Sequence, residues 1–108
     1  MGERGQILIK DTGVYLYTHW TGYRLKNILQ ESLSKKWRWN DEDYLTRIIF
    51  DVMTKEEHGT DTGYGIGSTQ KSDLNYPLLI VDVKNQMVFE ELKLWSFENF
   101  LKTKFEEE

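Results

Sequence analysis

The longest apolar run in the chain, Pro77 to Val81, is the sequence feature that most constrains the fold. A helix that crosses a bilayer needs about 18 to 20 apolar residues, so this run cannot span a membrane. A short apolar run is instead typical of a buried strand. The run continues through Asp82 and Val83. We therefore predict a strand over residues 78–83 that is buried on both faces and lies centrally in a sheet.

Two hairpins are predicted to build this sheet. Residues 6–10 and 14–18 have the pattern of two strands, and Asp11-Thr12-Gly13 between them is a turn sequence. A tight turn at Lys84-Asn85 is predicted to join the buried run to a partner strand over residues 86–90. The sheet is therefore expected to be four-stranded and mainly antiparallel.

Apolar residues at helical spacing predict two helices between the hairpins. The first helix carries Leu25, Ile28, Leu29 and Leu33 on one face, and the second carries Leu45, Ile48, Ile49, Val52 and Met53. Asn40 is expected to cap the second helix. The first turn of that helix, residues 41–43, is acidic and suits the positive end of the helix dipole.

A third helix is predicted over residues 97–104. Ser96 is a suitable N-cap for it, and Trp95, which precedes the cap, can pack against Phe100. The acidic tail, residues 105–108, is expected to fray because its charges oppose the dipole at that end of the helix.

The predicted order of elements, ββαα, loop, ββα, favours a single α+β domain over residues 1–108 with about three helices. The loop, residues 54–75, is polar and Gly-rich, and its length indicates either a functional loop or a partly disordered segment. Residues 63–67 superficially resemble a phosphate-binding glycine loop. Their G-x-G-x-G spacing matches neither the dinucleotide fingerprint nor a P-loop. We expect either a flexible lid or an irregular edge strand with glycine bends.

Four segments form a distinctive pattern, namely VYLYTHW at 14–20, YLTRIIF at 44–50, TGYGI at 62–66 and YPLL at 76–79. Together they resemble a family of small uncharacterised prokaryotic and viral proteins that has the same order of segments. The resemblance covers roughly residues 6–90. It implies no activity, no cofactor and no catalytic residue.

Composition and charge argue against several classes of function. The chain has no cysteine, which removes disulfides, thiolate nucleophiles and Cys-based metal sites. It carries 14 Lys and Arg against 18 Asp and Glu, a net charge of -4, and this acidity argues against nucleic-acid binding. The first residues contain no apolar segment typical of a secretion signal, so a cytoplasmic location is expected. No cofactor is predicted.

The junction between the first hairpin and the first helix, residues 18–24, is a candidate anion site. It places hydroxyls, an imidazole and a cation near a helix N-terminus, where free N–H groups attract anions. The predicted pocket lies between this junction and the loop over residues 58–67. The candidate ligand contacts are Thr18, His19, Thr21, Arg24, Gly63 and Gly65. The alternative is purely structural, with Thr21 as a helix cap.

His19 and His58 are the candidates for a general base, because imidazole titrates near neutral pH. Asp61 is the candidate to orient one of them. Glu56 and Glu57 add carboxylates that a divalent metal would accept, but the spacing matches no standard ligand motif. No metal site is therefore predicted.

Aromatic residues make up 14% of the chain and predict a protein-contact surface. Tyr15 and Tyr17 are expected on the sheet face opposite Val14 and Leu16. Exposed Tyr and Trp are typical of protein interfaces. The predicted partner contacts are Tyr15, Tyr17, Trp20 and Tyr64. The alternative is that helices cover both faces and these rings belong to the core.

The first prediction of function is a small protein-binding or accessory module rather than an enzyme. Its partner would be another protein or a second copy of the chain, since two hairpins leave sheet edges that subunits can pair. Neither nucleic acid nor a membrane is predicted as a partner. One alternative is a small enzyme or anion sensor that uses the pocket beside residues 18–24. Another is a regulator that presents acidic surface to a basic nucleic-acid enzyme.

Overall fold

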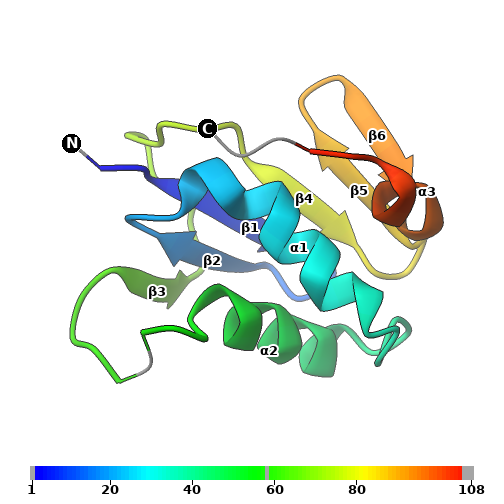
Figure 1. Ribbon diagram of the computed structural model, residues 1–108, viewed down its shortest axis with the longest axis horizontal. Helices are drawn as coiled ribbons and strands as arrows, with labels where there is room; N and C mark the ends of the chain where they lie inside the picture. The colour runs from blue at the N-terminus through cyan, green and yellow to red at the C-terminus, as the bar shows by residue number, and fades with distance from the viewer. Residues whose placement is uncertain (1, 58, 106–108) are drawn as a thin grey trace.

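The computed structural model describes residues 2–57 and 59–105. They form one six-stranded sheet with three α-helices and a short 3-10 helix (Figure 1). The strands are β1 (Gly5–Ile9), β2 (Val14–Thr18), β3 (Tyr64–Gly67), β4 (Leu79–Asp82), β5 (Met87–Glu90) and β6 (Lys93–Ser96). The helices are η1 (Gly22–Arg24), α1 (Leu25–Ser34), α2 (Glu42–Met53) and α3 (Phe97–Lys102).

The strand order is β3-β2-β1-β4-β5-β6, and the predicted four-stranded, mainly antiparallel sheet is wrong. Most neighbouring strands are antiparallel, but β1 and β4 are parallel, which makes the sheet mixed. The predicted order ββαα-loop-ββα lacks β3 and β6. β3 is a four-residue strand with two glycines inside the 54–75 segment, and β6 has only two apolar residues. Neither strand has enough apolar alternation to be recognised from sequence.

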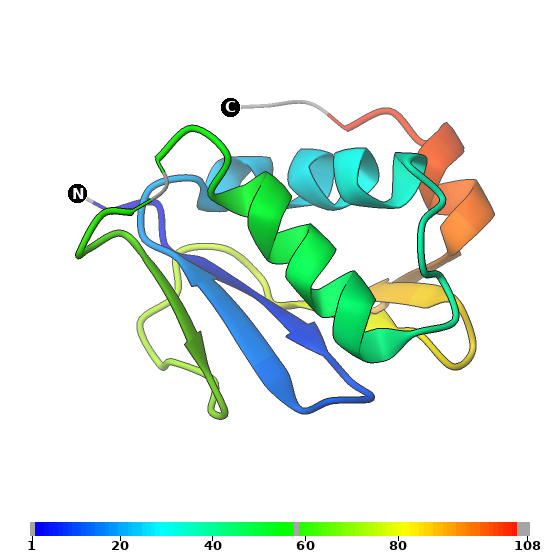
Figure 2. The same cartoon turned by 90° about the horizontal axis from the view of Figure 1, so that it is seen from below.

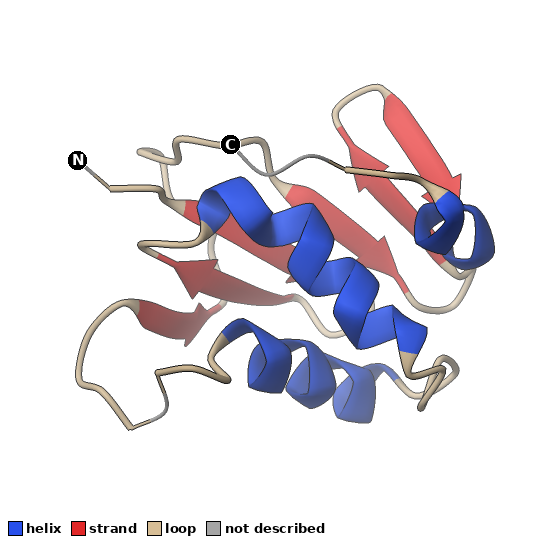
Figure 3. Ribbon diagram, viewed as in Figure 1, coloured by secondary structure: helices blue, strands red, loops and turns tan. Residues whose placement is uncertain are grey.

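The helices all pack against one face of the sheet (Figures 2 and 3). The sheet residues that form this side of the core are Ile7, Ile9, Leu16, Leu79, Val81 and Val88, all fully buried. The apolar faces predicted for the first two helices are confirmed, since every residue assigned to them is buried. The main core therefore lies between the helices and one face of the sheet.

No helix covers the opposite face in the part of the chain that the structure describes (Figure 2). Segment 68–78, which connects β3 to β4, crosses this face near Gln6. The Gln6 amide donates to the Thr69 carbonyl at 3.3 Å and accepts from the Lys71 N–H at 3.0 Å. Segment 68–78 does not cover this face completely, and Ile80 remains partly exposed on it. The prediction that residues 78–83 are buried on both faces is wrong for this reason.

The N-caps of α2 and α3 lie at the predicted residue or next to it. Asp41, rather than the predicted Asn40, caps α2, and its carboxylate accepts a first-turn backbone N–H at 3.2 Å. Ser96 caps α3 as predicted, through a hydrogen bond of 3.0 Å. The Trp95 ring packs against Phe100 with 5.3 Å between centroids, which confirms the predicted contact.

The start of the predicted acidic tail is packed rather than free. The ring centroid of Phe105 lies 4.9 Å from that of Phe100 and 5.6 Å from that of Trp95. The tail therefore contributes one aromatic residue to the cluster beside α3. Residues 106–108, which were also predicted to fray, lie outside the described residues.

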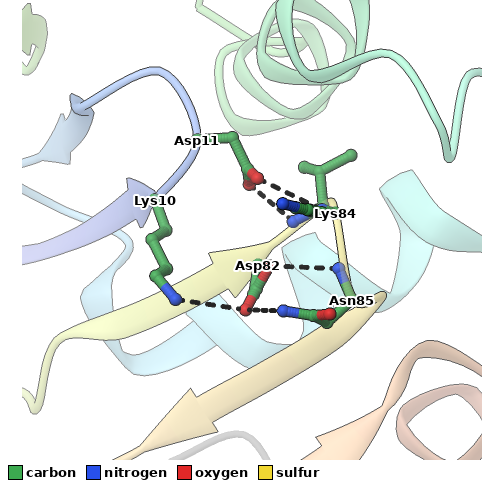
Figure 4. Close-up of polar contacts among 6 residues, drawn as sticks. Lys10, Asp11, Asp82, Lys84 and Asn85 are labelled. Atoms are coloured by element: carbon green, nitrogen blue, oxygen red, sulfur yellow. Dashed lines mark hydrogen bonds and ion pairs between the residues drawn. The ribbon is translucent and has the colours of Figure 1, made fainter.

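A polar cluster holds the ends of β1 and β4 together (Figure 4). Asp82 is only 3% exposed, and it accepts hydrogen bonds from the backbone and side chain of Asn85 at 3.1 and 2.9 Å. The Lys10 ammonium contacts the same carboxylate at 3.4 Å. Asp11 accepts from the first two backbone N–H groups after β4 at 2.7 and 3.2 Å. Residues that follow β1 thus fix the turn that follows β4.

The Asp82 cluster predicts an acid-dependent contribution to stability. Burial alone would raise the pKa of Asp82, but the hydrogen bonds from Asn85 and the contact with Lys10 outweigh it, and the pKa is lowered. Such a group stabilises the fold above its unfolded pKa, and the contribution is lost as pH falls through the folded pKa. We expect Asp82→Asn to lower the free energy of unfolding by about 1–3 kcal/mol near neutral pH.

Urea unfolding near neutral pH and at about pH 3 measures this contribution, since the unfolded carboxyl titrates near pH 4. The difference between wild type and Asp82→Asn should shrink at the lower pH. Asp51→Asn is the matched control, because it removes an exposed ion pair with Arg47 and should change stability by less than about 1 kcal/mol. An equal effect of Asp82→Asn at both pH values would contradict the assignment.

Candidate functional site

The structure contains a cavity that is lined by Thr21 and Arg24 of the 18–24 junction and by Tyr64 of the 58–67 loop, together with residues of α1 and α2 and the residues that follow α2. Its volume is about 260 Å³, and residues from η1, α1, α2 and β3 line it. The polar lining consists of Thr21, Arg24, Glu31, Lys55, Glu56, Glu57 and Tyr64. Two of the predicted ligand contacts, Thr21 and Arg24, therefore face the same cavity as residues that follow α2.

Two contacts order the charged lining of this cavity. The Lys55 ammonium lies 2.9 and 2.7 Å from the two carboxylate oxygens of Glu31, which links the end of α2 to α1. The Tyr64 hydroxyl donates to the Glu57 carboxylate at 2.8 Å. Burial, this hydrogen bond and the neighbouring carboxylates raise the pKa of Tyr64 to about 12. Tyr64 is therefore a hydrogen-bond donor at neutral pH and not a base.

The catalytic candidates do not gather in this cavity. The Nδ1 atom of His19 hydrogen-bonds with the Tyr17 hydroxyl at 3.0 Å, and the ring meets Trp20 edge-on. Neither His19 nor the exposed Asp61 lines the cavity, and His58 lies outside the described residues. Among the described residues, no group of three or more acidic, His or Cys side chains could hold a metal ion.

Thr18 shapes the junction rather than facing a ligand. It is fully buried, and its Oγ1 accepts from the backbone N–H groups of Trp20 and Thr21 at 3.3 and 3.1 Å. The same oxygen lies 2.7 Å from the Thr21 Oγ1. These hydrogen bonds hold the turn that leads from β2 into η1, and they position Thr21 in the cavity wall.

The local structure requires a glycine at position 63, whereas it does not require one at position 65. Gly63 has φ +95°, and its carbonyl accepts the His19 N–H at 2.8 Å. A Cβ at Gly63 would lie 2.4 Å from the Trp20 ring. At Gly65, which pairs with Tyr17 in the sheet, a Cβ would meet no atom closer than 4.0 Å. The contact between the residues that follow β2 and the residue that precedes β3 therefore depends on Gly63 in particular.

A second candidate site lies on the sheet face without helices. Five side chains form a row across this face, and we call this row the uncovered face. They are paired neighbours on β2, β1, β4, β5 and β6, namely Tyr15, Leu8, Ile80, Phe89 and Leu94. Leu94 is 57% exposed, and the other four side chains are partly exposed. The uncovered face is thus an apolar row across five strands.

Segment 68–78 and the uncovered face enclose a groove of about 500 Å³. Its lining includes Ile80 and Phe89 from the sheet, and Leu74 and Pro77 from the segment. The groove is therefore bordered by apolar side chains from two parts of the chain.

The residues predicted to bind a partner divide between the two sides of the sheet. Tyr15 and Tyr17 lie opposite Val14 and Leu16, as predicted, because they pair with Leu8 and Gln6. Tyr64 instead lines the cavity. Trp20 packs against Tyr64, with 6.1 Å between ring centroids.

Sequence reasoning missed most of the uncovered face, namely Leu8, Ile80, Phe89 and Leu94. Leu8, Ile80 and Phe89 all lie in continuous apolar runs of the sequence, without alternating polar residues. Because every residue of such a run is expected to be buried, the sequence does not show which side of the strand stays exposed.

Comparison with protein-family models, with curated protein sequences and with solved structures gave no match for this chain. The family resemblance of the four sequence segments therefore stays a prediction. The helices in the described ranges are all too short or too polar to cross a membrane.

The environment of Gly63 predicts a large difference between two glycine substitutions. Gly63→Ala should lower the free energy of unfolding by about 1–3 kcal/mol, because it adds positive-φ strain to a clash with Trp20. Gly65→Ala, two residues further along the chain in β3, is the matched control and should change stability by less than about 1 kcal/mol. Urea unfolding of both variants measures the difference. Equal stabilities would contradict the described packing of Trp20 on Gly63.

Proposed function

We propose that the chain is a protein-binding module that associates with a second copy of itself through the uncovered face. The observation that carries the proposal is the row of five apolar side chains with no helix over it. A sheet face that stays in water normally presents polar residues that alternate with core residues. A continuous apolar patch on a protein surface is instead typical of an interaction site.

The size and shape of the uncovered face suit a second copy of the same face. Neighbouring strands lie about 4.8 Å apart, so a row across five strands extends roughly 19 Å. Segment 68–78 borders part of the row, so a second copy would pack on the part that the segment leaves open, as one sheet packs on another in a β-sandwich. A two-fold axis needs only one self-complementary patch on each subunit. The small area predicts a weak dimer, of the kind that buries less than about 1,200 Å².

Charges around the groove do not oppose this association. Lys71 and Glu91, of opposite sign, both line it, so a second copy does not meet a rim of a single charge. Aromatic side chains at the centre of an interface contribute most to binding. Tyr15 and Phe89 are therefore the expected anchors, with Leu94 at the edge of the contact.

Sedimentation across a dilution series tests the proposal. The wild-type chain should change from 12.9 kDa toward twice that mass as its concentration rises to about 1 mM. Phe89→Ser and Leu94→Ser should each weaken the dimer at least about tenfold, because each removes roughly 1.5 kcal/mol or more of apolar burial.

Ile66→Ser is the matched control. Ile66 is 63% exposed, but it pairs with Leu16 and so belongs to the opposite side of the sheet, on the edge strand β3. Its substitution should leave the dimer unchanged. A strict monomer at about 1 mM would contradict the proposal. Loss of the dimer in Ile66→Ser alone would show edge pairing through β3 instead.

A further inference from the structure

The cavity between η1, α1, α2 and β3 is independent of the uncovered face. Tyr64 pairs with Thr18, and both residues belong to the helix-covered side of the sheet. Figure 1 shows the end of α2, the start of α1 and β3 around this region. A ligand in the cavity would therefore leave the proposed dimer contact free.

The charged groups of the cavity form two sets. Lys55 and Glu31 neutralise each other through their paired contact. The lining also holds one further cation, Arg24, and two further carboxylates, Glu56 and Glu57. Arg24 has a contact of its own, and Glu57 accepts from the Tyr64 hydroxyl. All three groups influence the Tyr64 hydroxyl. The two carboxylates raise its pKa, and Arg24 lowers it. Both signs of charge are thus present at one small site.

The rest of the lining is apolar. Ile28, Val52 and Met53 line the same cavity, and their exposed fractions are 4%, 7% and 4%. The volume of about 260 Å³ lies just below the range of about 300–1,000 Å³ that is typical of small-molecule pockets. The cavity therefore suits a ligand of the size of a single amino acid.

A simple ion fits this lining poorly. An anion would meet the carboxylates of Glu56 and Glu57, and a cation would meet the guanidinium of Arg24. A molecule that carries both charges and a short apolar group satisfies all three parts of the lining. We propose that the cavity binds a small zwitterion of the α-amino acid type, with its carboxylate at Arg24 and Thr21 and its ammonium at Glu56 and Glu57.

Titration of the full ¹⁵N-labelled chain with L-leucine tests this proposal. Saturable amide shifts are expected at residues 21–24, 52–57 and 62–64, with a Kd below about 1 mM. Two probes each lack one charge: 4-methylpentanoate has no ammonium group, and leucinamide has no carboxylate. Each should bind at least about tenfold more weakly than L-leucine. Absence of saturable shifts with L-leucine, or equal binding of 4-methylpentanoate, would overturn the proposal.

Charge-neutral variants assign the two ends of the ligand. Glu56→Gln should weaken L-leucine binding about tenfold without affecting 4-methylpentanoate, and Arg24→Gln should weaken L-leucine without affecting leucinamide. Glu98→Gln, an exposed substitution on α3, is the control and should change nothing. Glu56 is exposed, so its variant should keep the wild-type spectrum and decide the question even if Arg24→Gln unfolds. Unchanged L-leucine binding by Glu56→Gln would overturn the proposal.

Discussion

The parallel pairing of β1 with β4 is the contact on which the rest of the structure depends. It joins two antiparallel halves, β3-β2-β1 and β4-β5-β6, through the residue pairs from Ile7–Leu79 to Ile9–Val81. The helix α1 spans the same joint, since Lys26 contacts Glu90 of β5 at 3.2 Å. Because the fully buried residues come from both halves, the core closes only when this pair forms. The carboxylates of Asp11 and Asp82 fix its end.

This architecture separates two candidate sites on opposite sides of one sheet. All three α-helices pack on one side, where residues of α1 and α2 also line the polar cavity. The other side keeps an apolar row that segment 68–78 covers in part. The Gly-rich stretch therefore serves both sites, because its first part lines the cavity and its last part borders the groove. A ligand in the cavity would leave the apolar row accessible, because no residue lines both the cavity and the groove. The dimer and the cavity ligand can therefore be tested separately.

Local signals in the sequence predicted the helices but not the complete sheet. The apolar stripes of α1 and α2 and the Ser96 cap depend on neighbouring residues, and they agree with the structure. β3 pairs with β2, which is distant in sequence, and its two glycines give no strand signal. β6 pairs with the neighbouring β5, but its four residues include only two apolar ones. Of the residues predicted to contact a ligand, Thr21 and Arg24 line the cavity and His19 does not. The His19 ring instead hydrogen-bonds with Tyr17, which depends on a side-chain direction that the sequence does not show.

The central claim is that the uncovered face is where two copies of the chain meet. Isotope-filtered NOE spectroscopy on a mixture of ¹³C-labelled and unlabelled chains tests this most directly, because it detects contacts between copies alone. The account predicts intermolecular NOEs from Tyr15, Phe89 and Leu94, and none from the faces of α1 and α2. Intermolecular NOEs confined to the helices or to Ile66 on the β3 edge would contradict it.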